Sequence, residues 1–142
     1  MKQENKELLL RYLSMALPYG VCAHIRYKEG EPCYGKLMPR DIQWFIDSKI
    51  EVIKPYLRPM SSMTEEEDEK RIQLGIWRSS QTNGYEVTRI NPEGISESYD
   101  SQAFQKALVF LLKNHFDIFG LIPKGLAIEV TEENNPYNIT ED

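Results

Sequence analysis

Two histidines and two cysteines are the residues of this sequence best suited to acid–base, nucleophilic or metal chemistry. His115 stands two residues before Asp117, and a carboxylate so placed could orient the imidazole as a proton carrier. A metal site usually needs three or four ligands, and no cysteine belongs to a CxxC pair. His115 also stands at the expected end of a helix, where an imidazole can cap carbonyl groups. The sequence thus predicts no catalytic residue, metal site or cofactor, and leaves His115 and Asp117 as candidate binding residues.

Residues 54–59, with the sequence KPYLRP, form the most unusual local segment. Its two prolines fix φ and remove backbone donors, so we expect an extended crossing and neither a helix interior nor a central strand. Lys54 and Arg58 could hold an anion beside the helix start that follows, and Tyr56 and Arg58 could contact a protein partner. Lys54, Tyr56 and Arg58 are therefore candidate binding residues.

A helix is predicted to begin soon after this segment. Thr64 and Glu67 have capping-box spacing, as do Ser62 and Glu65. The four residues after Thr64 are acidic and already occupy the positive end of the helix dipole, which argues against an anion there. We expect the helix to end near Leu74, and we interpret the prolines and caps as mechanical parts of a rigid crossover.

The elements before this crossover follow clear periods. Apolar residues recur at helical spacing from Leu9 to Leu17, and Pro18-Tyr19-Gly20 ends the run. Residues 28–32 predict a turn, and residues 33–38 a return strand. Residues 20–27 alternate as in a half-buried strand, with one face made of Val21, Ala23, Ile25 and Tyr27 and the other of Cys22, His24 and Arg26.

Residues 41–54 fit two periods. The apolar residues form a helical stripe that includes Phe45, or one face of a strand that includes Trp44. Their β-branched and aromatic content favours two strands, residues 41–46 and 50–54, joined by a turn. The first half of the chain is then an antiparallel meander that follows one helix.

The second half contains one long apolar helix. Residues 81–84 predict a turn, residues 85–90 a strand, and residues 100–114 a helix. This helix is expected to be buried on most sides, because Val109 and Phe110 make it apolar nearly all round beyond its stripe of Phe104, Ala107, Leu108, Leu111 and Leu112. Residues 126–130 predict a short strand, and residues 131–142 a flexible acidic tail.

The two cysteines are expected to be small core residues without a disulfide. If the chain turns at residues 28–32, Cys33 lies near Tyr27 and Cys22 lies near Leu37 or Met38. The two thiols would then be several residues out of register, which is too far for a disulfide.

Charge is unevenly distributed along the chain. Residues 1–60 hold ten Lys and Arg against seven Asp and Glu, a balance of +3, and residues 61–142 have a balance of −8. Basic and aromatic residues alternate at Arg26-Tyr27-Lys28 and Tyr34-Gly35-Lys36, and such residues can stack and bind single-stranded nucleic acid on a sheet. The isoelectric point near 5.2 shows none of the basic excess expected of such a protein, so the sequence does not favour nucleic acid as a partner.

Length and hydropathy predict a single cytoplasmic domain. The 142 residues are enough for one domain with a core of its own. The apolar run at Leu8–Leu10 breaks at Arg11, and no window approaches the ~18 apolar residues of a membrane helix. We therefore expect an α+β domain in residues 1–130, with an antiparallel sheet packed by two or three helices, no membrane contact, and an open question as to homo-oligomers.

Two segments carry a resemblance to a known group of proteins. Residues 53–67, IKPYLRPMSSMTEEE, and the C-terminal block HFDxxGLIxxGLA, residues 115–127, resemble blocks in short uncharacterised proteins of gut-bacterial prophages and mobile elements. The two blocks cover about a fifth of the chain. The group has no assigned activity, so the resemblance implies a genomic context rather than a reaction.

The sequence alone leaves three functional hypotheses. The first is a non-enzymatic accessory protein that acts by binding another protein, because no stretch of the chain has a catalytic or phosphate-binding signature. The second is a small enzyme that uses His115 and Asp117 in a cleft. The third is weak binding of single-stranded nucleic acid on the sheet.

Overall fold

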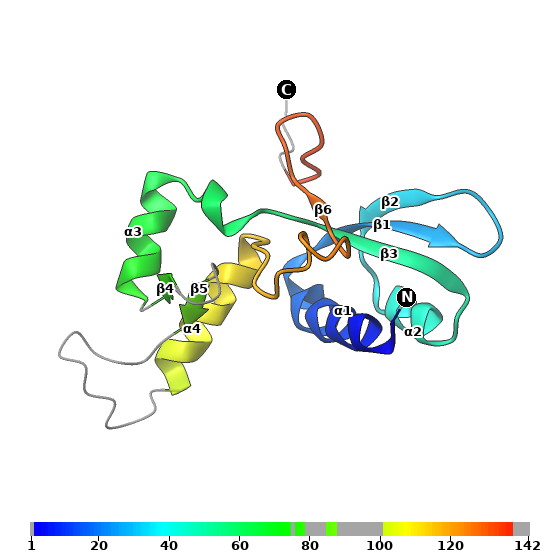
Figure 1. The fold of residues 1–142 in the computed structure, drawn as a ribbon, viewed down its shortest axis with the longest axis horizontal. Coiled ribbons are helices and arrows are strands. Elements are labelled where there is room, and N and C mark those ends of the chain that lie inside the picture. The colour runs from blue at the N-terminus through cyan, green and yellow to red at the C-terminus, as the bar shows by residue number, and fades with distance from the viewer. Residues whose placement is uncertain (1, 75, 79–84, 88–100, 138–142) are drawn as a thin grey trace.

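The computed structural model describes residues 2–74, 76–78, 85–87 and 101–137 (Figure 1). Residues 81–84 and 88–100, where we predicted a turn and the end of a strand, lie outside this description. The elements are, in chain order, α1 (Gln3–Ala16), the 3-10 turn η1 (Leu17–Tyr19), β1 (Cys22–Tyr27), β2 (Cys33–Lys36), α2 (Pro39–Ile46), β3 (Ile50–Leu57), the 3-10 turn η2 (Met60–Ser62), α3 (Glu65–Gln73), β4 (Ile76–Arg78), β5 (Tyr85–Val87), α4 (Ser101–Lys113) and β6 (Ile128–Glu129).

The main sheet has the strand order β2-β1-β3-β6. β1 is antiparallel to both β2 and β3, whereas β6 is parallel to β3, so the sheet is mixed and mostly antiparallel. β4 and β5 form a separate two-stranded ribbon. The predicted α+β class is confirmed, and β6, which lies within the strand predicted at residues 126–130, pairs in parallel although an antiparallel sheet was expected.

Helices α1 and α2 cover one face of the main sheet (Figure 1). The expected helical stripe Leu9, Tyr12, Leu13 and Ala16 is fully buried, as are alternate residues of β1 and β3. We call this the main core; its buried members are Leu9, Tyr12, Leu13, Ala16, Val21, Ala23, Ile25, Leu37, Phe45, Ile50, Ile53, Leu57, Leu112, Leu121, Leu126 and Ala127.

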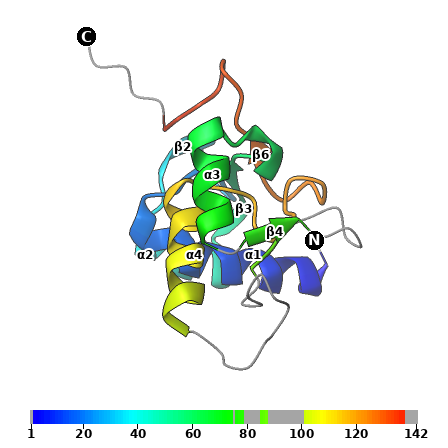
Figure 2. The same ribbon diagram turned by 90° about the vertical axis from the view of Figure 1, so that its left-hand side faces the viewer.

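A smaller apolar group, which we call the second cluster, lies at the other end of the molecule. Its buried members are Ala107 and Leu111 of α4 and Phe116, which follows α4. Partly buried side chains around it come from η2, from the end of α3 and from α4 itself. Figure 1 and Figure 2 show α3 and α4 in this part of the fold, and Leu74, directly after α3, packs against the second cluster.

The prediction of a strand at residues 41–46 was wrong, because these residues belong to α2. Pro39 stands in the first turn, where a missing N–H breaks no helical bond. The Asp41 carboxylate accepts the Met38 N–H at 2.8 Å, which satisfies a free donor at the helix start. Phe45 points into the main core, as the helical reading required. These start signals outweigh the strand preference of the β-branched residues.

The expectation that residues 54–59 lie outside a central strand was also wrong in part. β3 runs through Pro55 to Leu57 and pairs with two strands. Pro55 lies opposite Ala23 of β1, and β6 pairs with β3 at Tyr56 and Leu57. Among the described residues, β3 therefore has a paired strand on one side alone at Pro55, and proline is tolerated in such an edge-like position.

The predicted start of α3 is confirmed at Thr64. Its hydroxyl accepts the Glu67 N–H at 3.2 Å, and the Glu67 carboxylate accepts the Thr64 N–H at 2.9 Å. Ser62, the other predicted cap, instead donates its hydroxyl to the Pro59 carbonyl. The helix ends at Gln73, one residue before the predicted end.

The prediction that both cysteines are core residues was wrong. Cys33 is exposed and Cys22 is half-buried, and both are free thiols. Cys22 pairs with Lys36 and Cys33 pairs with Ile25, so the two lie at different positions of the hairpin, as expected.

Within the described residues, no helix is long and apolar enough to cross a membrane.

Candidate functional site

The two segments that carry the resemblance meet in the fold. Arg58, directly after β3, forms a parallel bridge with Phe116, which follows α4. The Arg58 N–H donates to the His115 carbonyl at 2.8 Å, and the Asp117 N–H donates to the Arg58 carbonyl at 2.9 Å. Three of the five candidate residues, Arg58, His115 and Asp117, therefore lie at one junction.

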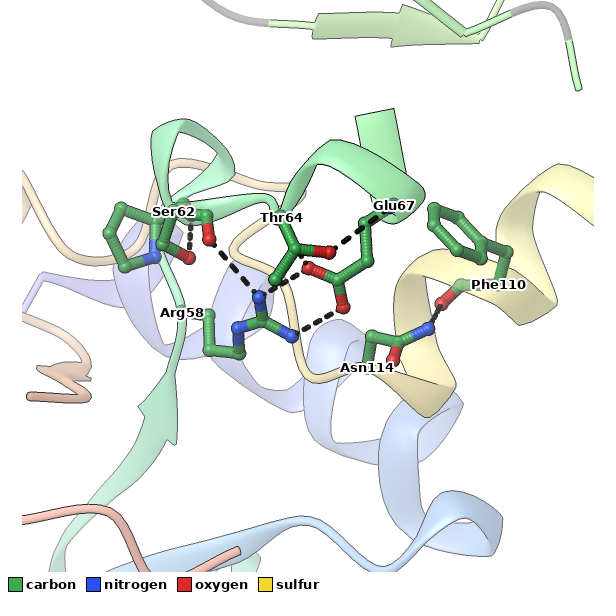
Figure 3. A network of polar contacts seen from close by, with 7 residues as sticks. Arg58, Ser62, Thr64, Glu67, Phe110 and Asn114 are labelled. Atoms are coloured by element: carbon green, nitrogen blue, oxygen red, sulfur yellow. Dashed lines mark hydrogen bonds and ion pairs between the residues drawn. The ribbon is translucent and has the colours of Figure 1, made fainter. Parts of the chain in front are cut away.

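The Arg58 side chain binds Glu67 in the first turn of α3 (Figure 3) and lies over the ring of Phe116, which follows α4. Its guanidinium forms two hydrogen bonds with the Glu67 carboxylate, Nη1 to Oε2 at 2.8 Å and Nη2 to Oε1 at 2.6 Å. The same group lies 4.4 Å from the centre of the Phe116 ring. The hydrogen bond from Arg58 is the largest cause that lowers the pKa of Glu67. Such bidentate pairing gives Arg58 a structural role at this junction.

Asp117 is buried and organises the loop after α4. Its carboxylate accepts the Leu121 N–H at 2.7 Å and the Ile122 N–H at 2.9 Å. Burial raises the pKa of Asp117, and the backbone N–H groups oppose this shift because they favour the charged form. The side chain therefore acts as a loop cap.

His115 ends α4 in a left-handed backbone conformation, with φ of 61°. Its N–H donates to the Leu112 carbonyl, and the Phe116 N–H donates to the Leu111 carbonyl. These two bonds define a Schellman motif, which confirms that His115 serves the helix end, although through its backbone and not by the predicted side-chain cap. Glycine is the usual residue at this position, and histidine is among the residues that tolerate it.

The His115 imidazole is stacked on the ring of Tyr137, with centroids 3.6 Å apart. Burial and, to a smaller extent, the charge of Arg58 together lower its pKa to about 4. The ring is therefore neutral near pH 7 and has Nδ1 buried without a hydrogen-bond partner among the described residues. The two carboxylate bonds of Asp117 go to backbone N–H groups, so the proposed His115–Asp117 pair gains no support from this geometry.

Tyr137 is a residue of this junction that the sequence analysis missed. Its hydroxyl accepts the Cys22 N–H at 2.8 Å and donates to the Tyr56 carbonyl at 2.7 Å, which joins the ends of β1 and β3. The segment expected to be a flexible tail is thus attached to the sheet at this point. The only available signal was that Tyr137 is the one aromatic residue within residues 131–142.

The side chains of Lys54 and Tyr56 lie on the sheet face that α1 and α2 leave uncovered. In β3 they alternate with the buried residues Ile53, Pro55 and Leu57. Lys54 lines a shallow hollow of about 340 Å³ together with His24, Arg26, Val52 and Ile128. These two candidate residues remain accessible, unlike Asp117.

A hollow lies between α3 and α4, and we call it the α3–α4 groove. It has a volume of about 870 Å³ and is lined by Lys70, Leu74, Gln105, Lys106, Val109, Phe110, Lys113 and Asn114. The apolar residues Leu74, Val109 and Phe110 are only partly buried. Three lysines surround them, so the groove combines an apolar floor with positive charge.

The junction and the groove are parts of one arrangement. Arg58 holds the first turn of α3 through Glu67 and the end of α4 through Phe116. Figure 3 shows Asn114 and Phe110 of α4 next to this ion pair, and the Asn114 side chain donates to the Phe110 carbonyl at 2.8 Å. The unusual residues of the two segments therefore position the walls of the α3–α4 groove.

In the described part of the chain, no three His, Cys, Asp or Glu side chains gather closely enough to hold a metal ion. Comparison of the chain with protein-family models, with curated proteins and with solved structures finds no match.

Proposed function

We propose that this chain is a non-enzymatic binding protein whose α3–α4 groove takes an acidic amphipathic helix of a partner protein. The observation that carries the proposal is a stripe on α4. Lys106, Val109, Phe110 and Lys113 recur at positions i, i+3, i+4 and i+7 and line the groove together. Residues at this spacing share one face of a helix.

The stripe accounts for the unusual composition of α4. Its opposite side, with Ala107 and Leu111, is buried in the second cluster. The sequence predicted that α4 is buried on most sides, yet Val109 and Phe110 face an open groove. A partner helix in the groove would bury these two side chains, which is the mode by which amphipathic helices bind apolar grooves.

The positive charges of the groove favour a partner helix that is acidic. Lys70 of α3 lies on one wall, and Lys106 and Lys113 of α4 lie on the other. The two lysines of α4 are seven residues apart, a distance of about 10.5 Å along the helix. A partner with Glu or Asp at seven-residue spacing beside its apolar stripe would match them, and complementary charge favours such a partner over a neutral one.

A designed peptide tests this proposal. A helix of about 16 residues, with leucines at i, i+3 and i+7 and glutamates beside them, should perturb NMR amide signals along α3 and α4. The Lys106→Glu/Lys113→Glu variant should weaken binding at least about tenfold. Lys28→Glu/Lys49→Glu, with the same charge change on exposed lysines at the other end of the molecule, is the matched control.

Two outcomes would contradict the proposal. One is equal binding by a peptide of identical composition whose leucines are scattered around the helix. The other is a set of perturbed signals that lies away from α3 and α4. Sedimentation of the free chain is measured alongside, and self-association that is abolished by Val109→Glu would show that a second copy fills the groove in place of another protein.

We also propose a setting for this activity, an accessory role in the cytoplasm of bacteria that carry prophages or mobile elements. The support is the resemblance of residues 53–67 and 115–127. Immunodetection in cell fractions tests the compartment, and recovery of the chain in the membrane fraction would contradict it.

A further inference from the structure

We propose that the uncovered sheet face forms a second, independent site, which binds single-stranded nucleic acid. The strand register places three residues in one row across the sheet. His24 of β1 lies between Tyr34 of β2 and Lys54 of β3. Neighbouring strands are about 4.8 Å apart, so the Cα atoms of Tyr34 and Lys54 are about 10 Å from each other.

Tyr34 supplies an aromatic surface that the fold does not use. Its exposed fraction is 72%, the highest among the exposed large hydrophobic side chains of the described residues. A flat ring on an open sheet can stack on a nucleic-acid base, and such stacking tolerates any base sequence.

Cations lie on both sides of this row. Lys36 follows Tyr34 on the same face of β2, and Arg26 follows His24 on the same face of β1. Arg26 and Lys54 border the 340 Å³ hollow, whose other lining residues include Val52 and Ile128. In the part of the chain that the structure describes, Arg26 forms an ion pair with Glu51 at 3.4 Å, with both side chains about half exposed. A phosphate could replace so weak a pair.

The acidic isoelectric point does not describe this face. β1, β2 and β3 all lie within residues 1–60, which have a balance of +3. Residues 128–142, which begin with β6, have a balance of −5, and β6 lies at the sheet edge opposite β2, the strand of Tyr34. Figure 1 shows the acidic helix α3 and the β1–β2 hairpin at opposite ends of the molecule. Screening over about 10 Å at ordinary ionic strength weakens the influence of the charges of α3 on the β1–β2 hairpin.

An exposed aromatic ring favours single-stranded nucleic acid over an acidic polypeptide. Three cations alone would attract either polymer, but stacking on Tyr34 and His24 requires flat rings at regular intervals along the anionic chain. In a duplex the base faces are already stacked on one another and cannot reach Tyr34.

Fluorescence anisotropy with labelled 12-nucleotide oligo(dT) and oligo(rU) tests the inference. Binding should fall in the range of about 1–100 μM at about 50 mM salt, and three cations predict a slope near −2 for log K against log salt. Lys54→Gln should make that slope shallower by about 0.7. Tyr34→Ala should weaken binding about tenfold at unchanged slope.

Controls separate this site from the α3–α4 groove. Lys113→Gln, in the groove, should leave oligonucleotide binding unchanged. Absence of binding at low salt would overturn the inference, as would binding of polyglutamate with equal affinity and no loss on Tyr34→Ala. The proposed helix-binding function would survive either result, because it depends on other residues.

Discussion

The main core and the second cluster are held together in different ways. Among the described residues, the main core has sixteen buried side chains, whereas the second cluster has three. The second cluster is completed by polar contacts, above all the Arg58 guanidinium over Phe116 and its ion pair with Glu67. Where little apolar surface is buried, a few hydrogen-bonded side chains fix the geometry, and the α3–α4 groove lies in that part of the molecule.

The largest effect should come from truncation in the main core. Leu13→Ala should lower the free energy of unfolding by about 3–5 kcal/mol, because the side chain is fully buried and leaves a cavity. Urea denaturation followed by circular dichroism measures this loss. A cost below about 1 kcal/mol would show that the main core is loosely packed and that the comparison of the two clusters is mistaken.

Removal of Arg58 should act on the second cluster alone. Arg58→Ala leaves the partly buried Glu67 carboxylate without its cation and should cost about 2–3 kcal/mol. Hydrogen exchange should accelerate in α3 and stay slow in β1. Arg58→Lys should recover little, since an ammonium group cannot form the bidentate pair. Uniform acceleration in both regions would contradict a division into two units.

Tyr137→Phe tests whether the C-terminal segment stabilises the sheet. The variant keeps the ring against His115 but removes the hydroxyl between Cys22 and Tyr56, so the Cys22 N–H loses its acceptor. We expect a loss of about 1.5–2 kcal/mol in the free energy of unfolding. Tyr34→Phe, on an exposed tyrosine, is the matched control and should change stability little.

The pH dependence of stability should report His115. Its folded pKa of about 4 lies below the ordinary value of 6.5, so between these pH values the unfolded chain takes up a proton and the folded chain does not. Stability should therefore be full above pH 6.5 and fall as the pH drops toward 4, by about 1 kcal/mol after discounting for partial exposure.

His115→Asn isolates this effect, because asparagine tolerates a left-handed backbone and does not titrate. Between pH 7 and pH 5, the free energy of unfolding should fall more for the wild type than for the variant. Asp117, whose pKa is raised, and Glu67, whose pKa is lowered, are present in both proteins. Their contributions to the pH dependence therefore cancel in the comparison. Parallel pH profiles would show that His115 titrates normally.

The smallest change in stability is expected from substitutions at the ends of α2 and α4. Both have Schellman bonds, with Ser48 (φ 63°) and His115 (φ 61°) in the position that favours glycine. Ser48→Gly should stabilise the fold by about 0.5–1 kcal/mol, because it removes side-chain strain. His115→Gly should gain less, since it also loses the ring contact with Tyr137. Thermal melts of the two variants measure the difference.

Several features of the fold follow from signals within a few residues. Thr64 and Glu67 set the start of α3 because a capping box closes over four residues. The same local rules explain the alternation in β1. The prediction for residues 41–46 was wrong because their apolar residues fit both the helical and the strand period. Pro39 and Asp41 were not weighed as helix-start signals.

The candidate site was predictable only as a set of unusual residues. Arg58, His115 and Asp117 stood out in the sequence and do meet in space, but their side chains are engaged with Glu67, with Tyr137 and with backbone N–H groups, respectively. Nothing within a few residues of Arg58 indicates that it faces Phe116, or that Tyr137 reaches Cys22. The excess of apolar residues on α4 predicted a helix that is buried on most sides. It did not predict where the groove lies.

The sequence by itself determined the helix ends, the alternation of β1 and the composition of α4, because those properties depend on backbone torsions and side-chain spacing over one or two turns. Only the tertiary structure decided which distant segments touch, since such contacts depend on how the whole chain closes upon itself. The pairing of Arg58 with Phe116 closes a loop of more than fifty residues, and its specificity comes from burial and hydrogen bonds formed once that loop is shut.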